Sequence, residues 1–453
     1  MTTDMDFDFF GSGPPDGPSK KSKAKKWWIL LAAVVAAVLI ALISLRNEIL
    51  NSPLLNAYPR QWQQYGLNAH HTSSWYHSTE HENWIYTLKG ESHGGGSIVN
   101  GTYFIGDNSG DVTAIQVTTG KARWVTHVAD NNIMTVPLVY QGRVFVGVGN
   151  NQFQPGHLIR GTGVNEIVAL SEKTGRILWT VKTSGEDMST FIVHQNVLYA
   201  LGGDGVLRAL RPSSGQVLWT LSLGGVDSMS SPVIVHHLLF AGMSSPYRTV
   251  AVNLETHRLA FQTPFPKAVA AVDDASIVYG DGKVYQQWVE RKAGSKTEYR
   301  QNLTAINATN GHVVWTYYEP YGVKQTPQDY EAAAPVYNKG ILYFGSSFHK
   351  QLYAISASNG QLLWNYQLSS AANETPVLTT NNVLIGDVQG NLYALDQLTG
   401  FPIGMKSYQG QIFLNADPVY CNGVLFVPMA SRSASGSPQA YVRAIPLSRF
   451  SGK

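Results

Sequence analysis

The segment Ala169–Trp179 reads ALSEKTGRILW, and its arrangement of alanine, glycine and tryptophan decides the fold of the chain. Gly175 follows polar residues that are typical of a tight hairpin turn, because glycine adopts positive φ without strain. The alanine therefore belongs to one β-strand and Trp179 to the next. A large indole at this register can dock between neighbouring sheets and bury a large area.

The same frame recurs along the chain, with glycine six positions and the aromatic residue ten positions after the alanine. Sharp copies are Ala114–Trp124, Ala209–Trp219, Ala305–Trp315 and Ala354–Trp364. Two copies are degenerate: Ala251–Phe261 has His257 in place of glycine, and Ala394–Gly404 keeps the turn but lacks the aromatic residue. The aromatic residues predicted to dock between sheets are Trp84, Trp124, Trp179, Trp219, Phe261, Trp315 and Trp364.

Two further strands precede each alanine. The first often begins with proline, as in VPLVY at 136–140 and SPVIV at 231–235, and proline is tolerated at the first position of a strand. The second is short and apolar and ends near glycine, as in VFVG at 144–147. Four strands in a period of 40 to 55 residues are typical of one blade of a β-propeller.

The two ends of the repeat region complement each other. Ala444 begins an eighth unit that ends before its aromatic position, whereas Trp84 has no alanine ten residues before it. Pairing of these two segments would close the ring and remove exposed sheet edges. The sequence therefore predicts an all-β, eight-bladed β-propeller of four-stranded blades at residues 61–450, preceded by one transmembrane helix.

Composition agrees with this fold and excludes several function classes. Charged residues make up only 14% of the chain, which contains 43 glycines, as suits short strands and tight turns. The net charge of +3 is too small to predict a nucleic-acid partner. The single cysteine, Cys421, excludes an intrachain disulfide, a cysteine-rich zinc site and an attached c-type haem.

The first sixty residues predict a membrane anchor. Residues 1–26 are polar and rich in glycine, proline and lysine, and we expect a disordered tail. Residues 27–45 carry no charge, and a helix of this length spans roughly 28 Å, about one bilayer core. A buried soluble helix and a cleaved signal peptide are the alternatives, but no good cleavage site follows the apolar run. We expect an uncleaved signal anchor, followed by a tether at residues 46–60.

Positive charge predicts the orientation of this anchor. Five lysines between residues 20 and 26 precede the apolar run, whereas only Arg46 follows it closely. The positive-inside rule therefore puts the tail in the cytoplasm and the propeller on the outer side of the cytoplasmic membrane. The expected localisation is that of a single-pass protein of the cell envelope.

The repeat A-[LIV]-x-x-x-T-G-x-x-x-W resembles the tryptophan-docking motif of the pyrroloquinoline-quinone-like propeller superfamily. The segment WQQYGLNAHHTS at 62–73 is similar to the usual opening of that superfamily, and the resemblance covers about residues 60–450. The resemblance implies the propeller fold. It implies less about function, because the superfamily includes quinoprotein alcohol and glucose dehydrogenases, the outer-membrane assembly lipoprotein BamB and other anchored proteins.

The resemblance to quinoprotein dehydrogenases implies a quinone in the central funnel, held by a vicinal cysteine pair and a calcium or lanthanide ion. Cys421 has no cysteine neighbour, so that clamp is absent. Acidic residues near the blade ends show no ligand spacing, and we interpret them as turn and rim carboxylates. They are Asp204, Asp273, Asp274, Glu331, Glu374, Asp387 and Asp417. No catalytic residue, metal site or cofactor is predicted, with pyrroloquinoline quinone as the alternative.

Two other patterns are interpreted as structural. Histidines at positions 70, 71, 77, 81 and 93 could form a metal-binding tract, but their spacing matches no defined site. Gly94–Gly96 lacks the strand, helix and following lysine of a phosphate-binding loop.

The sequence departs most from the repeat at residues 150–164, 288–300, 317–330 and 431–439. Long loops on a rigid ring usually carry function. The loop 317–330 supplies the candidate partner contacts Tyr317, Tyr318, Tyr321 and Tyr330, because tyrosine is a common interface anchor. A loop packed over its own blade is the alternative.

The predicted function is a non-catalytic scaffold or protein-binding propeller, tethered to the outer face of the cytoplasmic membrane and acting in envelope protein assembly. The partner expected is another envelope protein. The alternative is a quinoprotein-type oxidoreductase with an atypical pyrroloquinoline quinone site.

Overall fold

The computed structural model describes residues 34–35, 64–72, 74–75, 83–323, 334–414, 416–431 and 439–449. The chain divides into two compact units, Met1–Asn56 and Ala57–Lys453, and the second is described below. Apart from residues 34–35, the expected tail at 1–26, transmembrane helix at 27–45 and tether at 46–60 lie outside the described residues and stay predictions. Within the described ranges, no helix combines the length and apolar character needed to span a bilayer.

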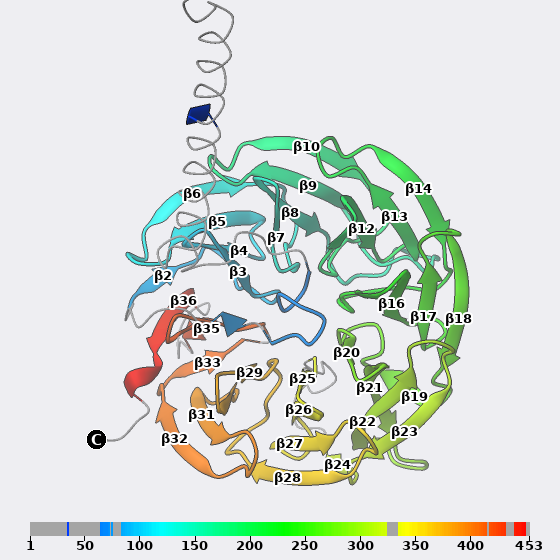
Figure 1. Cartoon of the computed structure of the whole chain (residues 1–453), viewed down its shortest axis with the longest axis vertical. Coiled ribbons are helices and arrows are strands. Elements are labelled where there is room, and N and C mark those ends of the chain that lie inside the picture. The colour runs from blue at the N-terminus through cyan, green and yellow to red at the C-terminus, as the bar shows by residue number, and fades with distance from the viewer. Residues whose placement is uncertain are drawn as a thin grey trace, which may run out of the picture. The chain divides into compact units, whose positions relative to one another are not determined.

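Eight β-sheets form a closed ring around a central axis (Figure 1). In blades 1 to 4, 6 and 7 the first strand lies near the axis and the last strand lies at the rim, and in blade 5 the innermost strand is β20. The chain passes from blade to blade in sequence order. The prediction of an all-β, eight-bladed propeller is confirmed.

Blades 1 to 4 have four strands each. Blade 1 contains β3 (Gly96–Val99), β4 (Thr102–Gly106), β5 (Asp111–Gln116) and β6 (Ala122–His127). Blade 2 contains β7 (Leu138–Tyr140), β8 (Arg143–Val148), β9 (Glu166–Ser171) and β10 (Ile177–Lys182). Blade 3 contains β11 (Ile192–His194), β12 (Val197–Leu201), β13 (Val206–Leu210) and β14 (Val217–Ser222). Blade 4 contains β15 (Val233–Val235), β16 (Leu238–Met243), β17 (Arg248–Asn253) and β18 (Arg258–Pro264).

Blades 5 and 8 add short strands to the four of the repeat. Blade 5 contains β19 (Ala268–Ala270), β20 (Val278–Gly280), β21 (Lys283–Arg291), β22 (Glu298–Asn307), β23 (Val313–Tyr318) and β24 (Gly322–Val323). Blade 6 contains β25 (Val336–Asn338), β26 (Ile341–Ser346), β27 (Gln351–Ser356) and β28 (Leu362–Gln367). Blade 7 contains β29 (Val377–Leu378), β30 (Asn382–Gly386), β31 (Asn391–Asp396) and β32 (Pro402–Ser407). Blade 8 contains β1 (Ser74–Trp75), β33 (Gln411–Phe413), β34 (Val419–Cys421), β35 (Val424–Ser431), β36 (Gln439–Pro446) and β2 (Ile85–Thr87), and the 3₁₀ helix η2 (Leu447–Arg449) follows β36.

The ring is closed by strands from opposite ends of the repeat region. Strand β2 pairs antiparallel with β36, with Tyr86 opposite Val442. The Trp84 carbonyl accepts a hydrogen bond from the Ala444 amide at 3.0 Å. The predicted pairing of these two segments is therefore confirmed, and it removes the free edge that β36 would otherwise expose.

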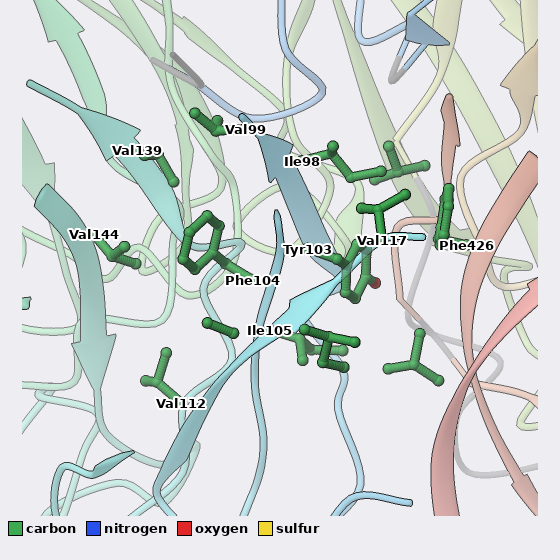
Figure 2. Close-up of a cluster of buried hydrophobic side chains, with 14 of the residues drawn as sticks. Ile98, Val99, Tyr103, Phe104, Ile105, Val112, Val117, Val139, Val144 and Phe426 are labelled. Carbon is green, nitrogen blue, oxygen red and sulfur yellow. The ribbon is translucent and has the colours of Figure 1, made fainter. Parts of the chain in front are cut away.

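The hydrophobic core lies between neighbouring blades (Figure 2). Tyr103 and Phe104 follow each other on β4 and are both fully buried. Because successive side chains on a strand point to opposite faces, Tyr103 stacks with Phe426 of blade 8 at 5.8 Å, whereas Phe104 lies on the side of Val139 and Val144 of blade 2.

The tryptophans of the repeat lie against the hairpin turn of the next blade. Trp315 Nε1 donates a hydrogen bond to the Ala357 carbonyl at 3.2 Å, and a Cβ added to Gly360 would lie 2.6 Å from the Trp315 ring. The same indole-to-carbonyl hydrogen bond joins Trp84 to Val117, Trp124 to Glu172, Trp179 to Pro212 and Trp364 to Gln397. Glycine in this turn therefore makes room for the indole, in addition to supplying positive φ.

The degenerate copies of the repeat have structural explanations. His257, which replaces the turn glycine, stacks on Trp219 with ring centroids 4.4 Å apart. Phe261 lies against Gly311 in the place of an indole. Gly404 stands where an aromatic side chain would dock against the hairpin turn of blade 8. Blade 8 has no such hairpin, because its outer strands β36 and β2 come from opposite ends of the chain.

Candidate functional site

A small cavity lies on the axis of the ring. Each of the eight blades contributes residues that precede its innermost strand, among them Thr190, Ser231 and Thr375. The cavity measures about 50 Å³. Pockets for drug-sized ligands measure roughly 300 to 1,000 Å³, so this cavity has room for an ion or a few water molecules but not for a cofactor of that size.

The segment before the first blade crosses the inner strands and narrows this cavity. The Ala69 carbonyl accepts a hydrogen bond from the Tyr279 amide at 2.8 Å, and the His70 carbonyl accepts one from the Tyr337 amide at 3.1 Å. Tyr65 is buried, and its hydroxyl hydrogen-bonds to Thr375 at 3.0 Å and donates to Asp417. The opening segment is thus bound along blades 5 to 8 rather than lying outside the ring.

A larger pocket of about 490 Å³ opens beside the axis. Its walls are mainly apolar and include Phe153, Tyr247 and Phe265, with Pro246, Pro264 and Pro266. Its charged side chains are Arg160, Asp273 and Asp274, and Asp274 also borders the axial cavity. Apolar walls with a few convergent polar groups are typical of a binding site.

Arg160 is positioned by backbone contacts with blade 3. Its amide donates to the Gly203 carbonyl at 3.0 Å, and its carbonyl accepts from the Glu186 amide at 2.8 Å. The guanidinium lies 3.6 Å from Asp273, 3.9 Å from Asp274 and 3.9 Å from Glu186. Among the described residues, its buried Nε has no hydrogen-bond partner. Three carboxyl groups therefore surround one cation, and two of them, Asp273 and Asp274, line the pocket with it.

Burial changes the titration of two of these acids. Desolvation raises the pKa of Glu186 well above its ordinary value, although Arg160 opposes the shift. Desolvation, together with repulsion from Asp274, raises the pKa of Asp273 to about 7. The charge of the pocket therefore changes in the neutral pH range.

A chain of aromatic ring contacts leads from this pocket to the extended hairpin of blade 5. Phe265 contacts Trp288 at 5.6 Å, and Trp288 contacts Tyr318 at 6.2 Å between ring centroids. The Arg300 guanidinium lies 4.4 Å from the Tyr318 ring and 4.6 Å from the Tyr321 ring, and it pairs with Glu290 at 2.7 Å. Cation–π contacts and the ion pair hold these side chains in one arrangement.

The four tyrosines predicted to form one loop have different environments. Tyr317 and Tyr318 belong to strand β23 rather than to a loop, and their side chains point to opposite faces of blade 5. Tyr317 is half-buried between blades, with its ring 6.2 Å from Phe344 and 5.8 Å from Tyr353. Tyr318 is 49% exposed, and Tyr330 lies outside the described residues. Tyr318 and Tyr321 are therefore the members that the structure brings together.

Of the acidic residues singled out near the blade ends, Asp273 and Asp274 meet at the pocket. Desolvation, together with repulsion from the nearby Asp387 and Asp417, raises the pKa of Glu374 to about 8. Asp204 pairs with Arg208, and Asp387 accepts hydrogen bonds from the Asn391 amide at 3.0 Å and the Tyr393 hydroxyl at 2.9 Å. Glu374 accepts the Gly386 amide, and Glu331 lies outside the described residues. Among the residues that the structure describes, no group of three or more His, Cys, Asp and Glu side chains is arranged to hold a metal ion.

Of the five histidines, three are described. His70 Nδ1 hydrogen-bonds to the Tyr279 carbonyl at 2.6 Å, and burial lowers the pKa of His71 to about 3. His93 borders the axial cavity, and His77 and His81 lie outside the described residues.

Sequence reasoning missed the partnership of Arg160 with Asp273 and Asp274. The signal available was the departure from the repeat at residues 150–164, which carries Phe153 and Arg160. The acidic partners come from the segment between β19 and β20 of blade 5, so spacing along the chain does not reveal the contact.

Comparison with known proteins gives one family. The family described as outer membrane protein assembly factor BamB matches residues 60–317 and 299–402. A tetrathionate hydrolase of Acidithiobacillus ferrooxidans is 25% identical over 266 residues, which are 56% of this chain and 53% of that protein. This chain thus spans about half the length of that relative. The outer membrane protein assembly factor BamB of Yersinia pestis is 23% identical over 351 residues, 75% of this chain and 82% of that protein.

Solved structures share the fold at low sequence identity. BamB from Moraxella catarrhalis has a TM-score of 0.55 at 15% identity, covering 79% of this chain and 98% of that one. Quinohemoprotein alcohol dehydrogenase from Comamonas testosteroni has a TM-score of 0.60 at 14% identity, covering 87% of this chain and 81% of that one. At such identities these likenesses show the fold alone, because one propeller fold hosts unrelated functions.

Proposed function

This chain belongs to the family of the outer membrane protein assembly factor BamB, and from that premise we propose that its propeller binds a partner protein and performs no catalysis of its own. Membership of the family alone does not decide this, because the fold is shared with dehydrogenases. The function therefore has to be argued from the surfaces of the ring.

One observation carries the proposal: the surface formed by the 490 Å³ pocket and the hairpin of blade 5, which are joined by ring contacts through the buried Phe265 and Trp288. Phe153 at one end of this surface is 52% exposed, and Tyr318 at the other end is 49% exposed. The Arg300 guanidinium lies against the rings of Tyr318 and Tyr321. Aromatic side chains and arginine dominate the energetics of protein interfaces. A partner that covers this surface would bury these anchors together.

The proposal extends to the place of binding. The uncharged run at residues 27–45 and the lysines before it support a membrane anchor with the propeller on the outer side. The partner would then be an envelope protein within reach of a tether of about fifteen residues, which spans about 50 Å when fully extended.

Pyrroloquinoline quinone does not fit the place where this fold would hold it. The axial cavity measures about 50 Å³, and Tyr65 and the opening segment narrow it. Enlarging the cavity would require displacement of a segment that hydrogen-bonds to the inner strands of blades 5 and 6. We therefore propose no quinone and derive no redox step.

The test is recovery of the partner by a variant of this surface. Replacing Phe153 with alanine and Tyr318 and Tyr321 with serine is expected to reduce co-purification of a crosslinked envelope protein by about tenfold or more, the effect of losing interface anchors. Tyr317 is left unchanged, because its ring packs between blades 5 and 6. Leu398→Ser, at a side chain that is 75% exposed on blade 7, is the matched surface control.

Thermal unfolding of both variants controls for folding. Unchanged recovery by the triple variant would move the binding site elsewhere on the ring. Turnover of tetrathionate by the purified protein, or quinone-dependent oxidation of an alcohol, would overturn the non-catalytic proposal.

A further inference from the structure

Five consecutive blades present possible metal ligands at one register beside the axis. The innermost strands of blades 1 to 5 are β3, β7, β11, β15 and β20. In each of these blades, the residue six positions before the end of that strand borders the axial cavity. These residues are His93, Met134, Met188, Met229 and Asp274. Around the axis, the three methionines follow the histidine and precede the aspartate. We call these five residues the arc, which offers sulfur, nitrogen and oxygen atoms as ligands.

Hydrogen bonds between the blades give this register the same geometry from blade to blade. Thr190, Ser231 and Ser276 each lie two residues after a member of the arc. The Val136 amide donates to the Thr190 hydroxyl at 2.9 Å, the Thr190 amide to Ser231 at 3.0 Å, and the Ser231 amide to Ser276 at 3.1 Å. Because one contact is repeated at each junction from blade 2 to blade 5, the methionines are held at the same height around the axis.

We propose that this arc binds a single soft monovalent cation, Cu(I), through the thioethers of Met134, Met188 and Met229 and the imidazole of His93. Thioether sulfur selects Cu(I), and imidazole is also a common copper ligand, whereas calcium and magnesium require several oxygen ligands. Methionine supplies three of the four proposed donors, so soft sulfur dominates the site.

The surroundings suit a small cation. The cavity of about 50 Å³ has room for one ion with a water molecule. Met188 is buried, and Met134 and Met229 are half-buried beside the cavity, so an ion would reach the sulfur atoms through the cavity. Asp274 adds one carboxylate at the end of the arc, which favours a positive charge.

One ring nitrogen of His93 contacts a carboxylate, as is usual for a metal-binding histidine. Its Nε2 lies 3.3 Å from the Glu91 carboxylate, and Nδ1 makes no hydrogen bond to any residue that the structure describes. A carboxylate on one ring nitrogen orients the imidazole and leaves the other nitrogen to bind the metal. The four proposed ligands do not line the 490 Å³ pocket, and of the arc only Asp274 borders both cavities.

The experiment is a titration of the full-length protein with Cu(I), under anaerobic conditions and against a chromophoric Cu(I) chelator. We expect one equivalent bound per chain, and the same stoichiometry with Ag(I) as a redox-stable probe. The triple variant Met134→Leu, Met188→Leu, Met229→Leu is expected to weaken binding by about 100-fold, since even outer partners of a metal site change affinity by up to that factor. Leucine fills nearly the same volume, so folding should survive.

Met243→Leu is the matched control, because Met243 is fully buried in blade 4 and does not border the cavity. In NMR spectra of methyl-labelled methionine, Ag(I) should shift the methyl signals of the three cavity methionines and leave that of Met243. If the triple variant unfolds, each single Met→Leu change should still weaken binding. No binding in competition with the chelator, or equal binding by the triple variant, would overturn the proposal.

Discussion

The contact between Trp315 and Gly360 shows how a single residue type joins two blades. The turn glycine supplies positive φ and leaves space for the indole, whose Nε1 donates to the Ala357 carbonyl. Both properties depend on the missing side chain, so alanine would lose both. His257 occupies the position of the turn glycine in one repeat, and its ring stacks on Trp219.

Gly360→Ala is expected to destabilise the propeller more than Gly282→Ala does. The two glycines have φ of 74° and 72°, so both variants share a backbone strain of about 1 kcal/mol. Only at Gly360 would the new Cβ meet a ring, at 2.6 Å, whereas nothing lies within 4 Å at Gly282. Overpacking should add about 1 to 3 kcal/mol to the loss of unfolding free energy in urea. Equal losses would show that the indole moves aside without penalty.

Among the elements, β2 is the strand on which closure depends. It has three residues, yet it covers the outer edge of β36, and the Leu88 amide extends the pairing to the Ala440 carbonyl at 2.9 Å. A free edge at β36 would present unpaired amides and carbonyls to other molecules. The opening segment at residues 64–75 adds contacts along the inner strands of several blades.

Deletion of residues 61–90 is expected to open the ring and cause aggregation. The deletion removes β1, β2 and the opening segment, so blade 8 loses strands at both edges and β36 becomes an exposed edge. Size-exclusion chromatography and cooperative unfolding measure the effect. Deletion of residues 1–26, which contribute no strand to the described sheets, is the control. A monomeric, cooperatively folding protein without residues 61–90 would contradict the role given to β2.

At the scale of the whole molecule, the ring buries carboxyl groups in several blades. Desolvation raises the pKa of Asp187 and Asp417 to about 7 and the pKa of Glu319 and Glu374 to about 8. A carboxyl group whose pKa is higher in the folded state binds a proton on folding in the pH range between the two values. These groups therefore link the stability of the ring to pH.

We expect the free energy of unfolding to decrease as the pH rises from about 4 to about 8. The unfolded carboxyl groups ionise near pH 4, whereas the folded ones keep their protons up to about pH 7 or 8, so the folded state binds more protons across this window. His71 acts in the opposite sense below its ordinary pKa, but it is one group against several. Urea unfolding at pH 5 and pH 8 measures the difference.

Glu374→Gln provides the control for this pH dependence. The amide oxygen can still accept the hydrogen bond from the Gly386 amide, but the side chain no longer ionises. The variant should show a smaller loss of stability between pH 5 and pH 8 than the unmodified protein. Stability that rises with pH in both proteins would show that these carboxyl groups are ionised in the folded ring.

The sequence by itself determined the blade, the number of blades and the way in which the ring closes. The frame of Ala169, Gly175 and Trp179 fixes a hairpin turn and the register of two strands, and these are local properties of the chain. Closure was also readable, because Trp84 and Ala444 are the two halves of one repeat unit. Resemblance to known propellers pointed to the same family that the comparison found.

Only the tertiary structure decided which side chains meet in the candidate sites. Arg160 comes from blade 2 and Asp273 from the segment between β19 and β20 of blade 5, and the curvature of the ring brings them together. Tyr317 and Tyr318 look equivalent in the sequence, but the alternation of a strand turns one toward blade 6 and exposes the other. The methionine arc likewise depends on the hydrogen bonds that set one blade against the next. The contacts of Arg160 and Tyr317 follow from the packing of whole blades, and no spacing along the chain encodes them. The methionines share one register of the repeat, but only the closed ring turns that register toward one cavity.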